Sequence, residues 1–253
     1  MDRIERVVSI LDYLALSAKP CGVSEISKKL HIDKSSVSRI LSSLERQKWV
    51  FQLPDNTYDL GNKLLDFSLS ILSHVELRKV SRPYLVELNS ITNETVCLGF
   101  RIGFEDVLLD HVDCKHIVRA VLELGHKGPL WKGATGKVIL AYMAKSEVDE
   151  VMDYLRESDD RMLASGKILE IDQLLEQLSE IRKQGFTITV GERSAAATNI
   201  ASPIIDYSNN AIGSISITGP LPRFNEEVAR SFSHVVKQAA QSISMKLGAN
   251  YRI

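Results

Sequence analysis

The sequence predicts an α+β protein with a small helical N-terminal part and a larger C-terminal sandwich of strands and flanking helices. Three observations predict this class. Residues 1–60 contain short segments of helical period followed by two β-prone runs, the period shifts towards strands beyond Asn93, and an amphipathic helix lies near the end. A chain of 253 residues, 44% of them hydrophobic, can bury two separate cores.

Three helices are expected at the start of the chain. Asp2 is placed to cap the first, with Glu5 three residues further on, and the "AKPCG" stretch ends it. Ser24 is expected to cap the second helix and Asp33 the third. Apolar residues fall at helical spacing in each: Ile4, Val7, Val8, Leu11 and Leu14, then Ile26 and Leu30, then Val37, Ile40, Leu41 and Leu44.

A hairpin is expected after the third helix. "WVFQL" and "TYDL" are β-prone runs, and "PDN" between them is a turn signal. A helix-turn-helix followed by a hairpin is the element order of a winged helix, so we predict a winged helix-turn-helix domain over 1–60.

The outward side of the third helix has the composition of a DNA-reading surface. Within 34–48, four basic residues face the single acid Glu45, so positive charge is concentrated on one element. Serines are poor helix formers for a merely solvated face, whereas short hydroxyls with Arg suit the major groove. A plain solvated face is the alternative. The candidate DNA-binding residues are Ser24, Lys34, Ser35, Ser36, Ser38, Arg39, Ser42 and Arg46.

A linker helix is expected over 61–75, followed by a domain over 76–253. That domain starts with a helix that we expect Pro83 to interrupt. Strands are predicted in "ETVCLGFRI", "EDVLLDHVD" and "HIVRAVLEL", and helices in "ATGKVILAYM" and "LEIDQLLEQLSEIRKQG". Strands return in "FTITV", "NIASPIID" and "AIGSISIT", with a turn at Asn209, and a last helix follows Asn225.

The stretch "GPLWKGATGKV" is not a phosphate-binding P-loop. Trp131 and Val138 stand where that motif needs a Gly and a Ser or Thr. The free backbone amides at the start of the following helix would suit a carboxylate. An ordinary loop capped by Thr135 is an equally good interpretation.

The strand "GSISIT" alternates strictly, which places Ser214, Ser216 and Thr218 on one face. If helices cover both faces of the sheet, these hydroxyls are buried and need partners, which a polar ligand would supply. Exposure of that face to solvent is the commoner arrangement for an antiparallel strand.

No metal, cofactor or catalytic centre is expected. In "DHVDCKH" the strand alternation separates His111 and Asp113 from Cys114 and His116, so no ligand set converges. An enzyme with a cysteine or serine nucleophile is the alternative class, but no base is paired by spacing with the candidates Cys97, Cys114, Ser194 and Ser202.

Over nearly its whole length the chain resembles bacterial regulators of the IclR (isocitrate lyase regulator) family. The matching stretches are "IERVVSILDYLA", "VSEISKKLHIDKSSVSRILSSLERQKWV", "YDLGNKLLDFSLSIL", "PLWKGATGKVILAYM", "IRKQGFTI" and "NIASPIIDYSNNAIGSISITGP". The resemblance implies a winged helix-turn-helix domain, a linker helix, and a GAF-like effector domain with a six-stranded antiparallel sheet. It also implies dimers, often paired into tetramers, on palindromic or near-palindromic operators.

The resemblance also implies an effector pocket. Carried over by position, the candidate effector-binding residues are Lys132, Gly133, Ala134, Thr135, Thr189, Asn199, Ser216 and Thr218. The chain departs from the family pattern where Thr189 replaces a usual acid, Asn199 a usual Cys, and Lys132 a usual small residue. Trp131 replaces a usual His and Ala196 a frequent Gly. These departures change the charge and the hydrogen-bonding capacity of the pocket.

Together these observations predict a DNA-binding transcriptional regulator and not an enzyme. Its partners would be double-stranded operator DNA, a second copy of the chain, and a small organic acid, first of all a carboxylic acid. The apolar runs are too short to span a membrane, and the N-terminus has a helix pattern without a cleavage site, so we expect a cytoplasmic protein. Repression and activation both remain open.

Overall fold

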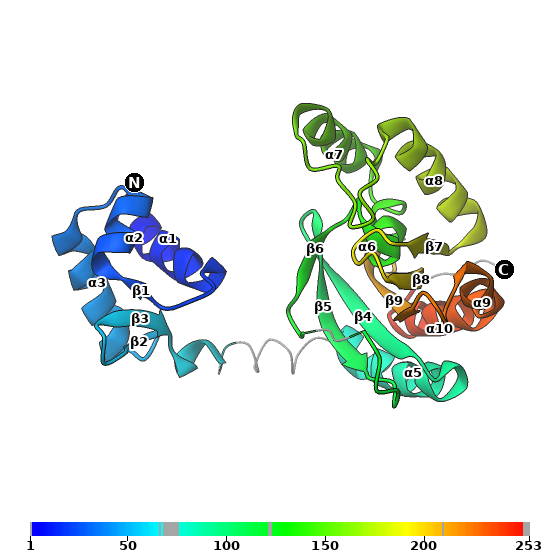
Figure 1. The fold of residues 1–253 in the computed structure, drawn as a ribbon, viewed down its shortest axis with the longest axis horizontal. Coiled ribbons are helices and arrows are strands. Elements are labelled where there is room, and N and C mark those ends of the chain that lie inside the picture. The colour runs from blue at the N-terminus through cyan, green and yellow to red at the C-terminus, as the bar shows by residue number, and fades with distance from the viewer. Residues whose placement is uncertain (1, 66, 68–75, 121–122, 209, 250–253) are drawn as a thin grey trace. The chain divides into compact units, whose positions relative to one another are not determined.

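The structure, a computed structural model, describes residues 2–65, 67, 76–120, 123–208 and 210–249. The chain divides into two compact units, Met1–Val75 and Glu76–Ile253 (Figure 1). Most of the linker helix predicted over 61–75 and the turn predicted at Asn209 lie outside the described residues.

The N-terminal unit is a helix-turn-helix followed by a hairpin, as predicted. Its helices are α1 (Arg3–Leu16), α2 (Val23–Leu30) and α3 (Lys34–Arg46), and its strands are β1 (Cys21–Gly22), β2 (Val50–Gln52) and β3 (Thr57–Leu60). The strands form an antiparallel sheet in the order β1-β3-β2. Asp2 and Glu5 make the predicted capping box: Asp2 Oδ1 accepts from the backbone N–H of Glu5 at 2.9 Å, and Glu5 Oε2 accepts from that of Asp2 at 2.6 Å.

The prediction that Ser24 caps α2 is wrong, because the N-cap is Gly22. Strand β1, which was not predicted, explains the difference. Cys21 and Gly22 pair with Tyr58 and Thr57 of β3, so the backbone stays extended up to Gly22 and the helix begins at the next residue. Asp33 is the N-cap residue of α3, as predicted, but its side chain makes no capping hydrogen bond.

One hydrophobic core holds the N-terminal unit together. Each helix turns its apolar side inward, and residues of the sheet complete the cluster. The fully or nearly fully buried members are Ile10, Leu14, Cys21, Ile26, Ile32, Val37, Leu41, Val50 and Tyr58. Val37 and Leu41 point into this core, which fixes the opposite side of α3 as the outer surface.

The C-terminal unit is built on an antiparallel sheet with the strand order β6-β5-β4-β9-β8-β7. The strands are β4 (Thr95–Ile102), β5 (Glu105–Val112), β6 (Lys127–Pro129), β7 (Thr187–Val190), β8 (Ala197–Ile205) and β9 (Ala211–Pro220). The central strands β4, β8 and β9 are buried along most of their length, so both faces of the sheet are covered.

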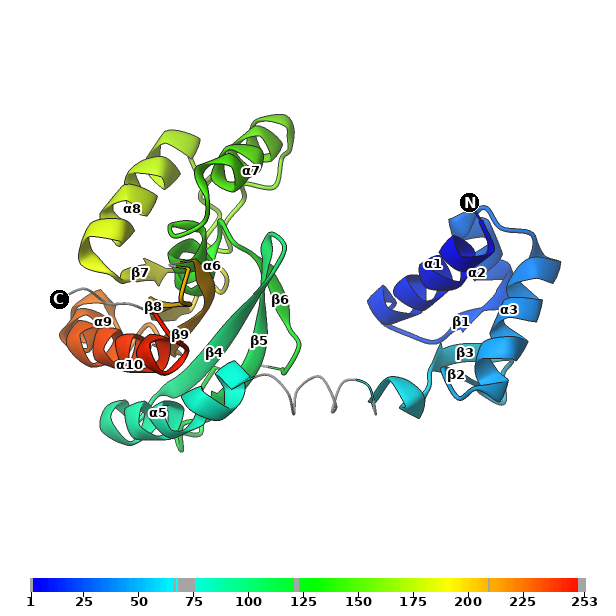
Figure 2. The ribbon, with the colours of Figure 1, turned by 180° about the vertical axis from the view of Figure 1, so that it is seen from behind.

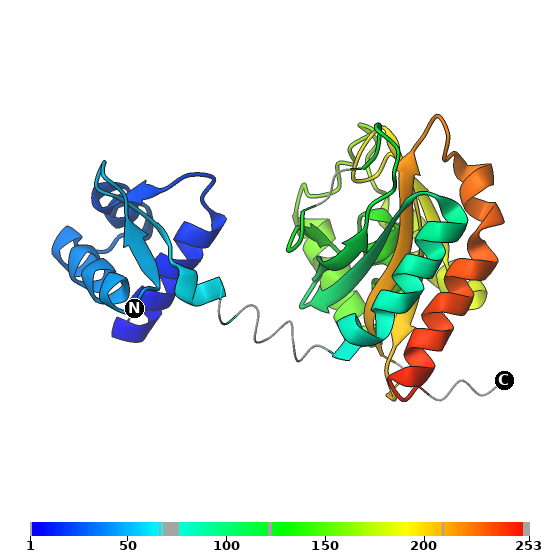
Figure 3. The same cartoon turned by 90° about the horizontal axis from the view of Figure 1, so that it is seen from below.

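Helices cover the two faces of this sheet differently. On one face α5 (Glu76–Thr92) and α10 (Ser233–Lys246) lie side by side, with α9 (Glu226–Ser231) before α10 (Figure 3). On the other face α6 (Gly133–Leu140) packs on β7, β8 and β9, and α7 (Lys145–Glu157) and α8 (Ile171–Gln184) enclose a core with it (Figures 1 and 2).

Three element predictions in this unit are wrong. Pro83 does not interrupt α5, which runs through it with its buried side on the sheet. The last helix is two helices, α9 and α10, that meet at Phe232. The predicted strand "HIVRAVLEL" is not formed in its described part, where Ile117 is 97% exposed. The edge of β5 that it would join is already paired, because Leu108 donates to the carbonyl of His126 and Val107 pairs with Lys127 of β6.

Candidate functional site

The outer surface of α3 presents the side chains that the sequence predicted for DNA contact. Lys34, Ser35, Ser38, Arg39, Ser42 and Arg46 are exposed, and Ser36 is half-buried. The Nε of Arg39 donates to the carbonyl of Ser35 at 3.3 Å, and no acid pairs with Arg39 among the described residues. Ser24 is exposed near the start of α2. This surface offers donors and positive charge to an anionic polymer.

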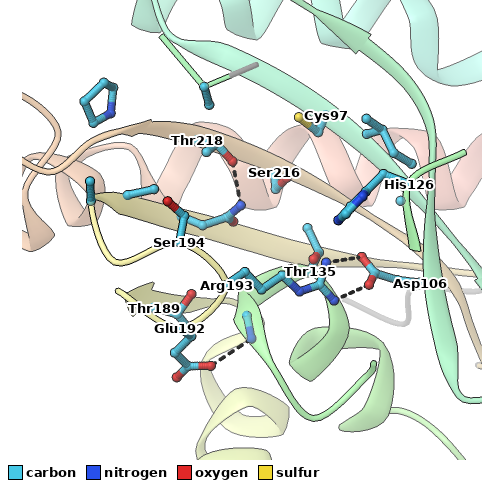
Figure 4. Close-up of a pocket in the computed structure, with 18 of the residues that line it drawn as sticks. Cys97, Asp106, His126, Thr135, Thr189, Glu192, Arg193, Ser194, Ser216 and Thr218 are labelled. Atoms are coloured by element: carbon cyan, nitrogen blue, oxygen red, sulfur yellow. Dashed lines mark hydrogen bonds and ion pairs between the residues drawn. The ribbon is translucent and has the colours of Figure 1, made fainter. Parts of the chain in front are cut away.

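The C-terminal unit contains a cavity of about 530 Å³ beside the N-terminus of α6 (Figure 4). Residues of β4, β5, β7, β8 and β9 form its floor, and the segments 118–120 and 192–197, with His126, form its sides. Its volume lies within the range of small-molecule sites.

The register of the sheet explains why polar side chains gather in this cavity. Thr189 pairs with Asn199, which pairs with Thr218, so three neighbouring strands direct them to one face. Ser216 lies two residues from Thr218 on the same face and pairs with Cys97 of β4. The predicted hydroxyl row of β9 is therefore buried and not exposed to solvent: Ser216 and Thr218 line the cavity, and Ser214 is buried outside it.

Two polar atoms at the cavity lack a hydrogen-bond partner. Neither the Ser216 hydroxyl nor Asn199 Oδ1 has one within the described chain, whereas Asn199 Nδ2 donates to Thr218 Oγ1 at 2.6 Å (Figure 4). Both atoms have almost no accessible surface, so they make the sheet polar beneath the cavity without being open to a bound molecule in this conformation.

Six of the eight candidate effector-binding residues line the cavity: Gly133, Thr135, Thr189, Asn199, Ser216 and Thr218. The other two, Lys132 and Ala134, are not among its lining residues. The ammonium group of Lys132 forms an ion pair with Asp160. Ala134 is fully buried in the core beneath α6.

The prediction of free amides at the start of α6 is wrong for its first two residues. The backbone N–H of Gly133 donates to Glu192 Oε2 at 2.8 Å, and that of Ala134 donates to Thr189 Oγ1 at 3.0 Å. An internal carboxylate therefore already occupies the position that was expected to receive one from a ligand (Figure 4).

The same carboxylate neutralises a buried lysine. Lys137 is 1% exposed, and its Nζ donates to Glu192 Oε1 at 2.5 Å and to Gln177 Oε1 at 2.9 Å. Burial lowers the pKa of Lys137, and the neighbouring Glu192 opposes that shift. No local sequence pattern predicts this pair, because Lys137 lies inside an apolar helix and Glu192 in a loop 55 residues away.

Arg193, next to Glu192, is also held at the start of α6. Its guanidinium forms two hydrogen bonds with the carboxylate of Asp106, which is buried, and donates to the carbonyls of Lys132 and Pro129 (Figure 4). A Cβ atom at Gly128 would come within 2.6 Å of this guanidinium, so a side chain there would push Arg193 out of this position. Neither residue of this pair was predicted from the sequence.

Two further residues that line the cavity, His126 and Arg119, have polar side chains without a hydrogen-bond or ion-pair partner among the described residues. Figure 4 shows the imidazole of His126 pointing into the cavity, and Arg119 also lines it. Both residues are exposed, in contrast to Ser216 and Thr218, so they lie at the open side.

The cavity lacks the features of a catalytic centre. Burial, with Asp113 and Asp106 nearby, raises the pKa of the Cys97 thiol to about 12, so a thiolate nucleophile is strongly disfavoured at neutral pH. Ser202 Oγ donates to the carbonyl of Gly185 at 2.7 Å, and the Ser216 hydroxyl has no base beside it. Among the described residues no three His, Cys, Asp or Glu side chains cluster to hold a metal ion.

A helix-turn-helix unit followed by an α/β unit with an internal cavity is the architecture of ligand-responsive bacterial transcriptional regulators. Residues 4–54 match the IclR helix-turn-helix domain, and residues 69–245 match the bacterial transcriptional regulator IclR C-terminal domain. The chain belongs to the IclR family.

Relatives and solved structures agree with this placement. The chain is 28% identical to the HTH-type transcriptional regulator KipR of Bacillus subtilis, over 89% of either chain. It is also 28% identical to the HTH-type transcriptional repressor AllR of Escherichia coli, over 97% of this chain and 90% of AllR. The Thermotoga maritima IclR crystal structure matches with a TM-score of 0.71 and 28% identity, covering 97% of this chain and 98% of that one.

A further crystal structure with this fold is a ligand complex. An IclR homologue from Microbacterium hydrocarbonoxydans, complexed with 4-hydroxybenzoate, has the same fold, with a TM-score of 0.81, 20% identity, and coverage of 97% of this chain and 99% of that chain. The family models make the protein a transcriptional regulator with a helix-turn-helix DNA-binding domain, and the named relatives are transcriptional regulators. No helix among the described residues is long and apolar enough to cross a membrane.

Proposed function

We propose that this protein controls transcription by binding an operator through α3 and that a small organic acid in the cavity changes its affinity for that operator. The observation that carries the ligand part is a cavity of about 530 Å³ lined by polar side chains of three neighbouring strands, Thr189, Asn199 and Thr218. The homologue complexed with 4-hydroxybenzoate supports an acid of that size.

Recognition of DNA falls to the exposed side of α3 in this proposal. Ser35, Ser38 and Ser42 reach phosphates, and Arg39 pairs with a guanine edge in the major groove. The basic residues Lys34 and Arg46, at the two ends of the helix, add contacts to phosphates.

The regulator acts as a dimer on a palindromic or near-palindromic operator, with a tetramer as the larger assembly. One short recognition helix contacts too few base pairs to find a site alone, and two copies read half-sites about one helical turn apart. A transcriptional regulator of bacterial type works in the cytoplasm, where its operator lies.

A binding-site selection tests the DNA part directly. Duplexes enriched from a random pool by the full chain should share one symmetric sequence, and Arg39→Ala should bind the selected duplex about five- to 150-fold more weakly at fixed salt. Lys145→Ala, an exposed residue of the C-terminal unit, serves as the control and should bind like wild type. Enrichment of no common sequence would refute the proposal, and so would unchanged affinity of Arg39→Ala for the selected duplex.

A further inference from the structure

The basic recognition helix α3 begins with an acidic side chain. Asp33 is its N-cap residue and is exposed. The helix itself carries Lys34, Arg39 and Arg46 on its exposed side, and its acid Glu45 lies near the other end. The end of α3 with Asp33 therefore combines positive charge with one carboxylate.

The carboxylate of Asp33 is not used within the described part of the chain. An N-cap carboxylate usually accepts from the backbone N–H two or three residues further on. Here the side chain makes no capping hydrogen bond, and the N–H of Ser36 donates instead to the backbone carbonyl of Asp33 at 2.9 Å. The carboxylate has no ion-pair partner among the described residues either, so its oxygens are left for a partner outside the chain.

The turn that carries Asp33 is fixed to α2. The Ser27 hydroxyl donates to the carbonyl of Ile32 at 2.6 Å, and the N–H of Ile32 donates to the carbonyl of Ser27 at 3.2 Å. The side chain of Ile32 is buried in the core of the N-terminal unit. The backbone at Asp33 is therefore ordered before DNA binds, and little conformational freedom is lost when its carboxylate finds a partner.

The edges of the four bases in the major groove suit a carboxylate unequally. A carboxylate accepts hydrogen bonds and donates none. Guanine presents the acceptors N7 and O6, and thymine presents the acceptor O4 and a methyl group. Adenine presents its N6 amino group beside the acceptor N7, whereas cytosine presents its N4 amino group alone. Cytosine is therefore the base that suits a carboxylate best.

The same carboxylate opposes binding to the wrong base. The phosphates repel it, and it loses water when the helix enters the groove. A hydrogen bond from cytosine offsets this cost, but guanine and thymine have no donor that could do so. An acid at the start of α3 therefore weakens binding to incorrect sequences more than binding to the correct one.

We propose, on the basis of the proposed function, that Asp33 is a specificity-determining residue of operator recognition. In helix-turn-helix proteins the N-terminal residues of the recognition helix contact base edges. The carboxylate of Asp33 accepts a hydrogen bond from the N4 amino group of one cytosine in each half-site. The charged residues predicted to contact DNA, Lys34, Arg39 and Arg46, are all donors, so Asp33 adds a charged acceptor to this surface.

Binding-site selection by variants of the full chain tests this role. Wild type should select a symmetric sequence in which one cytosine of each half-site depends on Asp33. In Asp33→Ala that position should lose its preference for cytosine. In Asp33→Asn it should change to adenine, because an amide bonds to both N6 and N7 of that base. Asn is also a favourable N-cap residue, so Asp33→Asn keeps the start of α3 intact.

A titration at fixed salt measures the size of the effect. Replacing the selected cytosine by thymine, with its partner base, should weaken wild-type binding by about fivefold or more and binding by Asp33→Ala much less. Glu45→Ala is the matched control, because it removes one exposed acid from the same helix at the other end. It should select the wild-type sequence. Thermal unfolding of each variant confirms that it is folded.

The proposal is overturned if Asp33→Ala or Asp33→Asn selects the wild-type sequence unchanged, or if Glu45→Ala alters the same position in the same way. Selection by wild type separates this role from the proposed function. A symmetric sequence that does not depend on Asp33 rejects the specificity role alone. If wild type selects no common sequence, the proposed function is rejected and the role of Asp33 with it.

Discussion

Glu192→Ala should strongly destabilise the C-terminal unit, because it leaves a buried ammonium without its counter-ion. Lys137 is 1% exposed, and Gln177 Oε1 at 2.9 Å is then its remaining hydrogen-bond partner among the described residues. Breaking a buried ion pair from one side costs about 3–5 kcal/mol. The part of this cost that comes from the unpaired charge has an upper limit, because Lys137 can instead lose its proton: from its ordinary pKa of 10.5 to pH 7, at about 1.4 kcal/mol per unit, this limit is about 5 kcal/mol.

Loss of the Lys137 proton in the folded variant makes the stability of Glu192→Ala depend on pH. A lysine that is neutral in the folded variant binds fewer protons than in the unfolded chain, so the stability of the variant rises with pH. The difference in unfolding free energy between wild type and Glu192→Ala should therefore shrink by up to about 1.4 kcal/mol per unit between pH 7 and pH 9.

Urea unfolding followed by tryptophan fluorescence measures this effect. The chain has two tryptophans, and in a Trp49→Phe background Trp131, which is buried beside Tyr154, reports the C-terminal unit. The double variant Lys137→Met/Glu192→Ala removes both charges and should recover most of the loss. A cost of Glu192→Ala below about 1 kcal/mol, or a double variant as unstable as the single one, would refute the reasoning.

Three further predictions concern DNA and the thiol. Ser38→Ala should weaken operator binding less than Arg39→Ala, because it removes one neutral hydrogen bond, and neither should change thermal unfolding; equal losses in a fixed-salt titration would contradict this. Footprinting should show two half-sites about one helical turn apart, and protection of a single half-site by monomer would count against the dimer. Cys97 should resist alkylation by iodoacetamide at pH 8 in the folded chain, since with a pKa of about 12 only about one thiol in ten thousand is ionised; labelling at the rate of the unfolded chain would argue against its burial.

Much of the fold could be predicted from local sequence signals. The capping box at Asp2 and the inward-facing apolar residues of α3 follow from short-range rules, and Gly185 ends α8 in the left-handed conformation as its position predicts. The alternation of "GSISIT" predicted the hydroxyl row. Whether that row faced water depended on helices elsewhere in the chain, and only the structure shows it buried.

The errors arise where distant residues decide local structure. Strand β1 forms because Cys21 pairs with Tyr58, 37 residues further along the chain. The segment 116–120 lies outside the sheet because residues 125–129 already pair with β5. The same limit applies to the cavity. Asp106 and Arg193 are 87 residues apart, and their pairing has no signature in the sequence.

The effector-pocket residues implied by the family resemblance were only partly correct. The family resemblance correctly predicted that Thr135, Thr189, Asn199, Ser216 and Thr218 line one cavity. The register of the sheet, which places the strand residues side by side, is a property of the whole fold. The resemblance could not show that Lys132 turns to Asp160, because the direction of a long side chain depends on its local partners.

The central claim is that the cavity and the recognition helix are coupled in one molecule, and the most direct test is the affinity for the selected operator with and without a saturating ligand. With 4-hydroxybenzoate, the ligand of the homologue's crystal structure, wild type should change its operator affinity by about five- to 150-fold, and the operator should change the affinity for this acid by the same factor. Ser216→Leu, which fills the floor of the cavity, should bind the operator like ligand-free wild type and ignore the acid. An operator affinity of wild type that is identical with and without bound acid would contradict this coupling.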